Sequence, residues 1–252
     1  MNMTGNTILV TGGGSGIGQA LAENLHRLGN TVIITGRRQS ALDTVTAANP
    51  GMVSRVLDVT DAQAIKAFAT EITAAYPALN VVIHNAGIMV QEKITAAPDY
   101  LADAEATIAT NLLGPIRLNA ALLPHLQSLP DATVATVSSG LAFVPYVITP
   151  TYSATKAGIH AYSMAIREQL KGTSVKVVEI APPYVQTELM SAAQASDPHA
   201  MPLADFISEV IDILSKDGDV KEVIVERCRP LRYAAENGNF DAVFTGLNAP
   251  RH

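Results

Sequence analysis

Residues 7–18 read TILVTGGGSGIG, and this stretch decides the fold. Its first four residues are apolar or β-branched and predict a short buried strand. Glycines dominate the rest, and residues 19–28 then carry apolar side chains at helical spacing up to Gly29. A glycine-rich turn between a first strand and a first helix lets the backbone approach a phosphate, which the helix N-terminus attracts. The stretch predicts a dinucleotide-binding unit, with a plain surface turn as the alternative.

The rest of the chain alternates apolar strands with longer helical segments. Strands are predicted at 7–10, 31–35, 53–57, 80–84, 133–137, 174–180 and 222–225, and helices at 61–76, 102–126 and 151–171. Such alternation predicts an α/β fold, here one domain over residues 1–252: a doubly wound parallel sheet of the Rossmann type with helices on both faces. A ligand is then expected at the carboxyl ends of the strands.

Composition excludes several functional classes. The 252 residues are 48% hydrophobic and 16% charged, which suits a large core and not a disordered chain. The net charge of −6 disfavours a nucleic-acid partner. A single cysteine, Cys228, forms no internal disulfide, and the six histidines form no cluster in sequence, so we expect no metal. Residues 1–5 lack a basic leader and no apolar stretch reaches membrane length, so we expect a cytoplasmic protein without a membrane partner.

Tyr152 and Lys156 stand four residues apart, thirteen residues after Ser139. On a helix this spacing places both side chains on one face. A lysine ammonium beside a phenol favours the phenolate and should bring the tyrosine pKa towards neutrality. Tyr152 is therefore a candidate general acid and base, although the same spacing arises by chance on many helices.

Together these motifs resemble the short-chain dehydrogenases/reductases of about this length. The matching residues keep the family's order and spacing from residue 11 to about 187, and they are Thr11, Gly12, Gly16, Gly18, Asn85, Ala86, Gly87, Asn111, Ser139, Tyr152 and Lys156. Beyond Val225 the chain looks like the branch of oxidoreductases named after the D-alanine-ester operon, because it lacks the Gly-Gly ending of many family members.

The resemblance implies a catalytic set of Asn111, Ser139, Tyr152 and Lys156. Tyr152 would exchange the proton, Ser139 would position the reacting oxygen, and Lys156 would also hold the nicotinamide ribose. Asn111 would hold a water beside the lysine, with an asparagine that bends its helix as the alternative. The implied cofactor site comprises Gly12, Gly14, Ser15, Gly16, Ile17, Gly18, Arg37, Arg38, Asp58, Val59, Asn85, Ala86, Gly87, Tyr152, Lys156, Pro182, Val185 and Thr187.

The end of the second strand favours NADP(H) over NAD(H), which stays open as the second cofactor. NAD-binding folds of this type place an acid there to hold the ribose hydroxyls. Gly36 occupies the position here, and Arg37 and Arg38 follow with guanidinium groups that match a 2′-phosphate. Two arginines that only solvate a loop are the alternative. Asp58-Val59 resembles the pair near the adenine, and it also suits a turn before the next helix.

The predicted function is the reversible reduction of a neutral ketone or aldehyde to an alcohol by hydride transfer. Residues 188–205 correspond to the family's mobile substrate lid, and neither they nor the loop after Ser139 offers a lysine or arginine to clamp an anion. A non-catalytic NADP-binding sensor is the alternative. We expect a homodimer through the helices 102–126 and 151–171, with a tetramer as the second option.

Three further interpretations concern the surroundings of the site. His84 is expected to be a strand-end histidine with satisfied hydrogen bonds, not a base. Pro183 replaces the family's glycine and should stiffen the loop under the nicotinamide, because proline fixes φ. The residues after Tyr233 are expected to form a polar tail.

Overall fold

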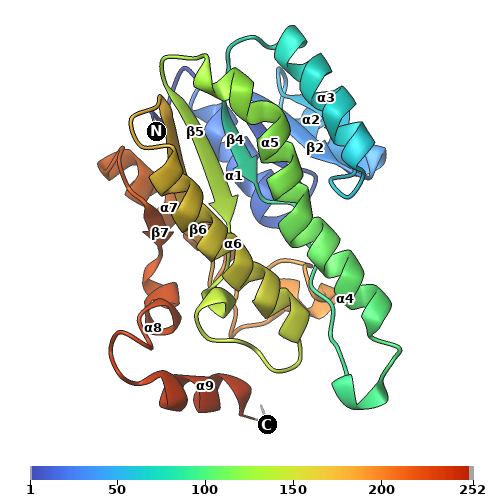
Figure 1. The fold of residues 1–252 in the computed structure, drawn as a ribbon, viewed down its shortest axis with the longest axis vertical. Coiled ribbons are helices and arrows are strands. Elements are labelled where there is room, and N and C mark those ends of the chain that lie inside the picture. Colours follow the sequence, from blue (N-terminus) through green and yellow to red (C-terminus); the bar gives the residue numbers. More distant parts are fainter. Residues whose placement is uncertain (1, 250–252) are drawn as a thin grey trace.

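The computed structural model describes residues 2–249 and contains a parallel sheet of seven strands in the order β3-β2-β1-β4-β5-β6-β7. The order reverses direction between β1 and β4, so the predicted doubly wound sheet is confirmed (Figure 1). The strands are β1 Thr7–Thr11, β2 Thr31–Gly36, β3 Val53–Val56, β4 Leu79–His84, β5 Ala132–Val137, β6 Val175–Ala181 and β7 Glu222–Ile224.

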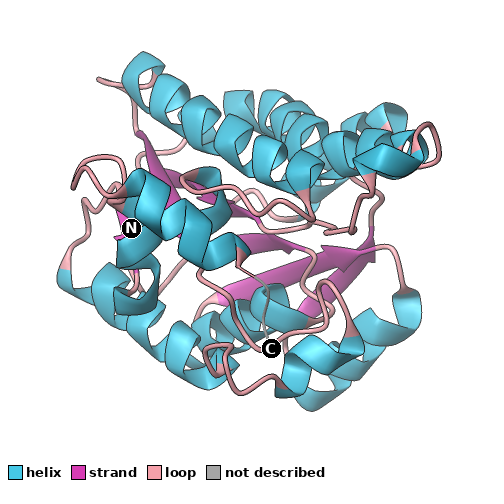
Figure 2. Ribbon diagram, turned by 90° about the horizontal axis from the view of Figure 1, so that it is seen from below, coloured by secondary structure: helices cyan, strands magenta, loops and turns pink. Residues whose placement is uncertain are grey.

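Helices cover both faces of the sheet (Figure 2). They are α1 Gly16–Arg27, α2 Gln39–Ala48, α3 Ala62–Ala75, α4 Leu101–Ile108, α5 Gly114–Gln127, α6 Pro150–Gln169, α7 Leu203–Lys216, α8 Arg229–Arg232 and α9 Phe240–Asn248. Helices α2, α7, α8 and α9 were not predicted from the sequence. No helix among residues 2–249 is both long enough and apolar enough to cross a membrane.

Alternation along the strands divides the core into two layers. Ile8 and Val10 of β1 pack with residues of α1, α2 and α7, whereas Leu9, between them, packs with residues of α3 and α5. All three side chains are fully buried. Because successive strand residues face opposite sides, the continuous apolar runs of the sequence give a sheet buried on both faces.

The predicted helix 102–126 is interrupted, so that prediction was wrong in one respect. Residues Ala109–Leu113 form a π-helical turn between α4 and α5. Within this turn the Asn111 side chain reaches Ile88, in the segment after β4. Such turns insert one residue into a helix and frequently occur at functional sites. The irregularity aims Asn111 towards the carboxyl edge of the sheet.

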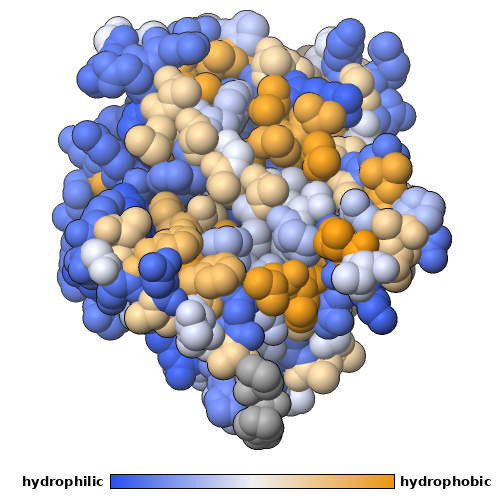
Figure 3. Space-filling model, turned by 60° about the horizontal axis from the view of Figure 1, so that its bottom comes forward, coloured by the Kyte–Doolittle hydropathy of each residue, from blue (hydrophilic) through white to orange (hydrophobic). Residues whose placement is uncertain are grey.

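The C-terminal segment is not a polar tail, because it folds into helices below the carboxyl ends of the strands (Figure 1). Phe240 and Phe244 of α9 stack with ring centroids 6.0 Å apart. Asn248 accepts a hydrogen bond from the Val147 amide at 2.8 Å and donates one to the Pro145 carbonyl at 3.1 Å. Figure 3 shows apolar side chains gathered in groups on this lower face of the molecule.

Candidate active site

The glycine-rich turn after β1 is shaped to receive a ligand backbone. Gly12 has φ of +68°, and a Cβ at this position would lie 2.9 Å from the Ala86 Cα. A Cβ on Gly18 would overlap the Gly12 carbonyl and the Asn85 side chain. Gly18 therefore allows close packing of α1 under the turn and does not itself line the cavity. This cradle fits the pyrophosphate of a dinucleotide at the N-terminus of α1.

Asn85 ties the turn to the neighbouring strand. Its side-chain amide donates to the carbonyls of Thr11 at 3.0 Å and Gly12 at 3.3 Å. In return, the Thr11 hydroxyl accepts from the backbone amides of Asn85 and Ala86, each at 3.0 Å. The segment Asn85–Gly87 thus fixes the carboxyl ends of β1 and β4 together.

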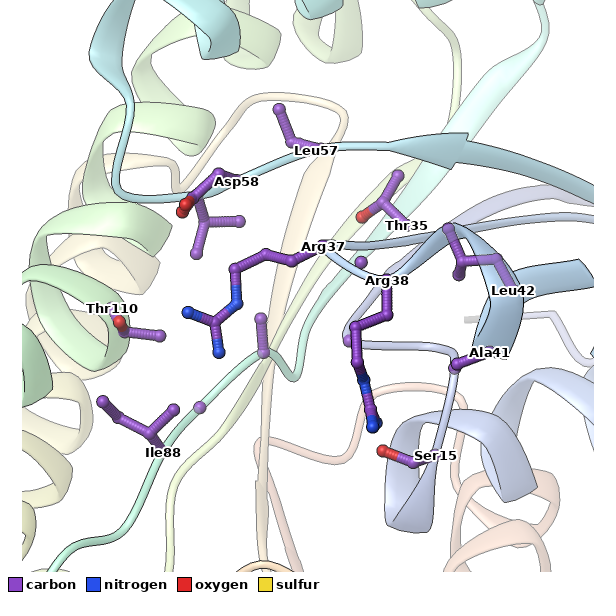
Figure 4. Close-up of a pocket in the computed structure, with 16 residues that line it drawn as sticks. Ser15, Thr35, Arg37, Arg38, Ala41, Leu42, Leu57, Asp58, Ile88 and Thr110 are labelled. Atoms are coloured by element: carbon purple, nitrogen blue, oxygen red, sulfur yellow. The ribbon is translucent and has the colours of Figure 1, made fainter.

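A small cavity lies at the end of β2, and Figure 4 shows its lining side chains. Arg37 extends across it beside Asp58 and Thr110, and Arg38 extends towards Ser15. Both arginines are exposed, and no salt bridge to either is found within residues 2–249. Two unpaired guanidinium groups at the mouth of a cavity are suited to an anionic ligand.

Asp58 forms the expected turn after β3. Its carboxylate accepts from the Thr60 amide at 2.9 Å and hydroxyl at 2.8 Å. The Thr60 amide is the main reason why the pKa of Asp58 lies below its ordinary value, and Arg37 adds a smaller lowering. The N-cap of α3 is the next acid, Asp61, which accepts from the amides of Gln63 and Ala64.

The predicted catalytic side chains from β5 and α6 converge at the carboxyl edge of the sheet. Tyr152 and Lys156 are buried on one face of α6, with the Lys156 Nζ 5.4 Å from the centre of the Tyr152 ring. Ser139 lies directly after β5 and hydrogen-bonds Tyr152. Its Oγ also accepts from the Leu141 amide at 3.1 Å, which leaves the Ser139 hydrogen available for donation. The arrangement combines a proton donor with a second donor for one oxygen.

The expected fall in the Tyr152 pKa does not occur in this structure. Burial raises the pKa of Tyr152 to about 12, and the hydrogen bond from Ser139 offsets only part of that rise. The Lys156 ammonium instead donates to the Val137 carbonyl at 2.8 Å. Burial also lowers the pKa of Lys156 to about 8, against an opposing attraction from Glu179. The phenol is therefore fully protonated at neutral pH and is ready to donate.

Asn111 joins three parts of the site. Its Oδ1 accepts from the Ile88 amide at 2.9 Å, and its Nδ2 donates to the Ile88 carbonyl at 2.8 Å and to the Thr155 hydroxyl at 3.3 Å. The space beside Gly87 is tight, because a Cβ on it would lie only 3.3 Å from the Asn111 Oδ1 and 3.7 Å from the Lys156 Nζ. Asn111 therefore lies in a distorted helix, as the alternative expected, and its role in holding a water beside Lys156 stays a prediction.

The loop after β6 passes close to the glycine-rich turn. The Pro182 carbonyl accepts from the Gly140 amide at 2.8 Å, and Val185 is buried in a bridge to Met201. A Cβ on Gly16 would lie 3.5 Å from the Thr187 Cγ2. The loop thus lines the same cavity as Ser139 and Tyr152, and it holds residues for which the sequence predicted cofactor contacts.

One large cavity of about 970 Å³ joins these elements. It shares Gly12, Ser15, Arg37 and Arg38 with the smaller cavity at β2, so the two form a continuous groove. All predicted cofactor residues except Gly18 line one or both cavities. Sequence reasoning missed Leu231 and Leu247, which line the large cavity from the C-terminal segment. The helical spacing of Phe240, Val243, Phe244 and Leu247 was a signal for α9.

His84 does not match its prediction. It is 4% exposed, and neither ring nitrogen has a hydrogen-bond partner among the described residues. Burial lowers the pKa of His84 to about 4, so the ring is neutral at physiological pH. The prediction of a satisfied histidine was wrong, because β4 is covered on both faces and brings no donor or acceptor to the ring.

Fold and cavity define a dinucleotide-binding oxidoreductase of the Rossmann class, and comparison with known proteins agrees. The family model described as short chain dehydrogenase matches residues 6–198. The chain therefore belongs to the short-chain dehydrogenase family. It is 37% identical to the uncharacterized oxidoreductase DltE of Bacillus subtilis, over 98% of both chains. The predicted resemblance to the D-alanine-ester-operon branch is confirmed.

Solved structures share the fold. A short chain dehydrogenase of Burkholderia cenocepacia, solved in complex with NADP, superimposes with a TM-score of 0.82 at 23% identity, covering 99% of this chain and 100% of the other. A short chain dehydrogenase/reductase of Burkholderia phymatum, solved in complex with NAD, gives a TM-score of 0.80 at 17% identity, covering 100% and 98%. One of these two neighbours was thus solved with NADP and the other with NAD, and both share the fold of this chain.

Proposed function

We propose that this protein reduces a neutral ketone or aldehyde to an alcohol with NADPH, and catalyses the reverse oxidation. The observation that carries this proposal is the convergence of Ser139, Tyr152 and Lys156 at the inner end of a groove that begins at two unpaired arginines. When bound, the cofactor supplies or accepts a hydride at the carbonyl carbon. The protein then has to position that carbonyl and deliver a proton to its oxygen.

Tyr152 acts as the general acid in reduction. Because burial holds its pKa at about 12, the phenol is protonated over the physiological range and transfers its proton as negative charge develops on the substrate oxygen. Ser139 donates a hydrogen bond to the same oxygen, because its Oγ already accepts from the Leu141 amide. Lys156 supplies a positive charge beside the phenolate that forms, and Asn111 holds the neighbouring Ile88 segment in place.

NADP(H) is the preferred cofactor in this proposal. No carboxylate stands at Gly36, and the guanidinium of Arg38 lies on the Ser15 side of the small cavity (Figure 4). This places a cation where the adenosine ribose would meet the end of β2. Arg37, Asp58 and Val59 line the same small cavity and would flank the adenine. NADH remains a weaker alternative, because its ribose hydroxyls would face two cations and no acid.

A neutral substrate suits the inner end of the groove. Its charged lining residues besides Lys156 are acidic, Glu188 and Asp197, whereas Arg37 and Arg38 lie at the opposite end. An anionic substrate would therefore meet repulsion and no clamp. Apolar contacts come from Leu141, Ile148 and Leu247.

We assign residues 188–205 as a lid that closes over the substrate. Leu189, Met190 and Gln194 line the large cavity from this segment. Gln194 fastens the segment to the cofactor loop, because its side chain donates to the Val185 carbonyl at 2.8 Å and the Thr187 hydroxyl at 3.2 Å. The segment also supplies the first turn of α7, at Leu203. Substrate and cofactor loops are thereby linked.

The proposed assembly is a homodimer through α4, α5 and α6. Large apolar side chains on α4, on α6 and on the π-helical turn before α5 are exposed, namely Leu101, Ile108, Leu113 and Met164. A second copy of the same face would remove them from water.

The test is NADPH oxidation with a panel of neutral ketones and aldehydes. Turnover by the wild type is expected to fall by at least about 10²-fold in Tyr152→Phe, which removes the proton donor. Tyr162→Phe is the matched control, since Tyr162 lies on the same helix and hydrogen-bonds Asn119. Tight NADPH binding without turnover of any carbonyl would favour the alternative, a non-catalytic sensor of the same fold.

A further inference from the structure

A fully buried carboxylate lies behind the proposed active site. Glu179 of β6 is 0% exposed, and its Oε2 accepts from the His160 Nδ1 at 2.8 Å. No donor among the described residues reaches its Oε1. A buried carboxylate with a vacant oxygen is costly unless a positive charge lies nearby. Glu179 interrupts an otherwise apolar strand end, so a role beyond packing is indicated.

Helix α6 and strand β6 bring Lys156 towards this carboxylate. Lys156 and His160 are one helical turn apart on the face of α6 that meets the sheet. The Lys156 Nζ donates to the Val137 carbonyl, and Val137 is the register partner of Ile180, the residue next to Glu179. The attraction of Glu179 opposes the lowering of the Lys156 pKa by burial. The ammonium and the carboxylate therefore approach one region of the sheet from two elements.

The remaining ionisable groups around Glu179 form a chain of alternating charge. Glu222 of β7 is its register partner, and the Arg232 guanidinium of α8 holds both Glu222 oxygens, at 2.7 Å and 3.4 Å. His160 has a raised pKa because it hydrogen-bonds Glu179. Burial and Glu179 together raise the pKa of Cys228 to about 12, so this thiol stays neutral.

A metal ion is the rival use of this cluster. Ligand atoms of His160, Glu179 and Glu222 lie within 4.8 Å of one another. Arg232, however, already supplies the positive charge at Glu222, and its side chain also lies over the Phe143 ring at 4.8 Å, which fixes it in place. The cluster is thus an ion-pair network whose vacant oxygen belongs to Glu179.

We propose that the Glu179 carboxylate, oriented by His160, is the counter-charge that keeps the Lys156 ammonium protonated in the buried active site. This inference rests on the proposed function, because Lys156 is assigned there. Glu179 and His160 are positioning residues and touch neither substrate nor cofactor. The Val137 carbonyl is the only hydrogen-bond partner of the ammonium among the described residues, so without the charge of the carboxylate the ammonium would lose its proton at a lower pH.

The test is Glu179→Gln, which keeps the shape and removes the charge. Titration of isotope-labelled lysine Cε by NMR, assigned with Lys156→Arg, is expected to show the Lys156 pKa lowered by at least about one unit. The alkaline limb of the carbonyl-reduction profile is expected to move to lower pH by the same amount. Glu168→Gln is the matched control, since Glu168 lies on α6 but is exposed and pairs with Lys171.

The NMR titration separates this inference from the proposed function, because it needs no substrate. A Lys156 titration that is unchanged in Glu179→Gln would overturn the inference, even if carbonyl reduction is observed. A shifted titration in a protein that reduces no carbonyl would support the counter-charge and contradict only the proposed activity. If Glu179→Gln does not fold, Glu179→Asp, which retracts the charge by one carbon, is expected to lower the Lys156 pKa by a smaller amount. An unchanged titration in that variant would overturn the inference as well.

Discussion

Replacing the two arginines after β2 should change the choice of cofactor. In Arg37→Asp with Arg38→Leu, one guanidinium is lost and the other is exchanged for a carboxylate at the mouth of the small cavity. NADPH binding is expected to weaken strongly, because its 2′-phosphate loses its cations and meets an anion. NADH lacks that phosphate, so its binding should change by less than about threefold, the scale of a weak exposed contact.

The expected loss of NADPH binding free energy depends on how exposed the two arginine side chains are. A charge-assisted hydrogen bond contributes about 1.5–3 kcal/mol, and both arginines are exposed, so about 1–1.5 kcal/mol for each is appropriate. With the added repulsion, the total is about 3–4 kcal/mol, or about 10²–10³-fold in Kd. Arg38 lies on the Ser15 side of the cavity (Figure 4). Of the two single variants, Arg38→Leu should therefore cause the larger loss of NADPH affinity.

Cofactor fluorescence titrations measure both dissociation constants. Arg27→Leu is the matched control, because Arg27 is an exposed arginine near the end of α1 and does not line the groove. It removes one positive charge without removing a residue that lines the groove. If the double variant keeps the wild-type ratio of NADPH to NADH affinity, or if Arg27→Leu changes that ratio equally, the phosphate assignment is refuted.

Two further predictions concern stability and the substrate pocket. The pKa of His84 is about 4 in the folded protein against an ordinary 6.5, because burial disfavours the charged ring. The contribution of the neutral ring to the free energy of unfolding is therefore fully present above pH 6.5 and is lost as the pH falls towards 4. About 3 kcal/mol of unfolding free energy should disappear over this window, and denaturant titrations should show the loss in the wild type and in the exposed control His199→Leu, but not in His84→Leu. Asn248→Ala removes both hydrogen bonds that fasten α9 to residues 145–147. The KM for carbonyl substrates should then rise several-fold, while the Kd of NADPH is unchanged. An unchanged KM would contradict a role of α9 in the substrate pocket.

Local signals were sufficient to predict the glycine-rich turn and most of the sheet. Strand β1 and its turn are contiguous in sequence, and the buried runs of a parallel sheet contrast with the polar segments between them. The convergence of Ser139, Tyr152 and Lys156 was also predictable, because all three come from the carboxyl ends of strands or the helix that follows β5. In the folded protein all three side chains line the large cavity, and their catalytic roles stay predictions.

The sequence predictions that failed concern features that depend on tertiary packing. Asn111 was recognised as a residue that could bend its helix, but the π-helical turn at residues 109–113 accompanies contacts of Asn111 with Ile88 and Thr155 that the sequence did not predict. The sequence predicted a lowered Tyr152 pKa because it considered only the neighbouring Lys156. In the folded protein burial is the largest cause, and it raises the pKa. Glu179 was visible as a charge within an apolar strand, but its relation to Lys156 required the packing of α6 on β6.

The C-terminal segment connects the two parts of the site that the sequence left unexplained. Leu231 of α8 and Leu247 of α9 line the large cavity, while Arg232, next to Leu231, neutralises Glu222 in the charge network behind Lys156. Because α8 both lines the large cavity and pairs with Glu222, a change that moves α8 should affect the substrate pocket and the buried charges together. We therefore expect changes in α8 to influence both the substrate choice of this protein and the protonation of Lys156.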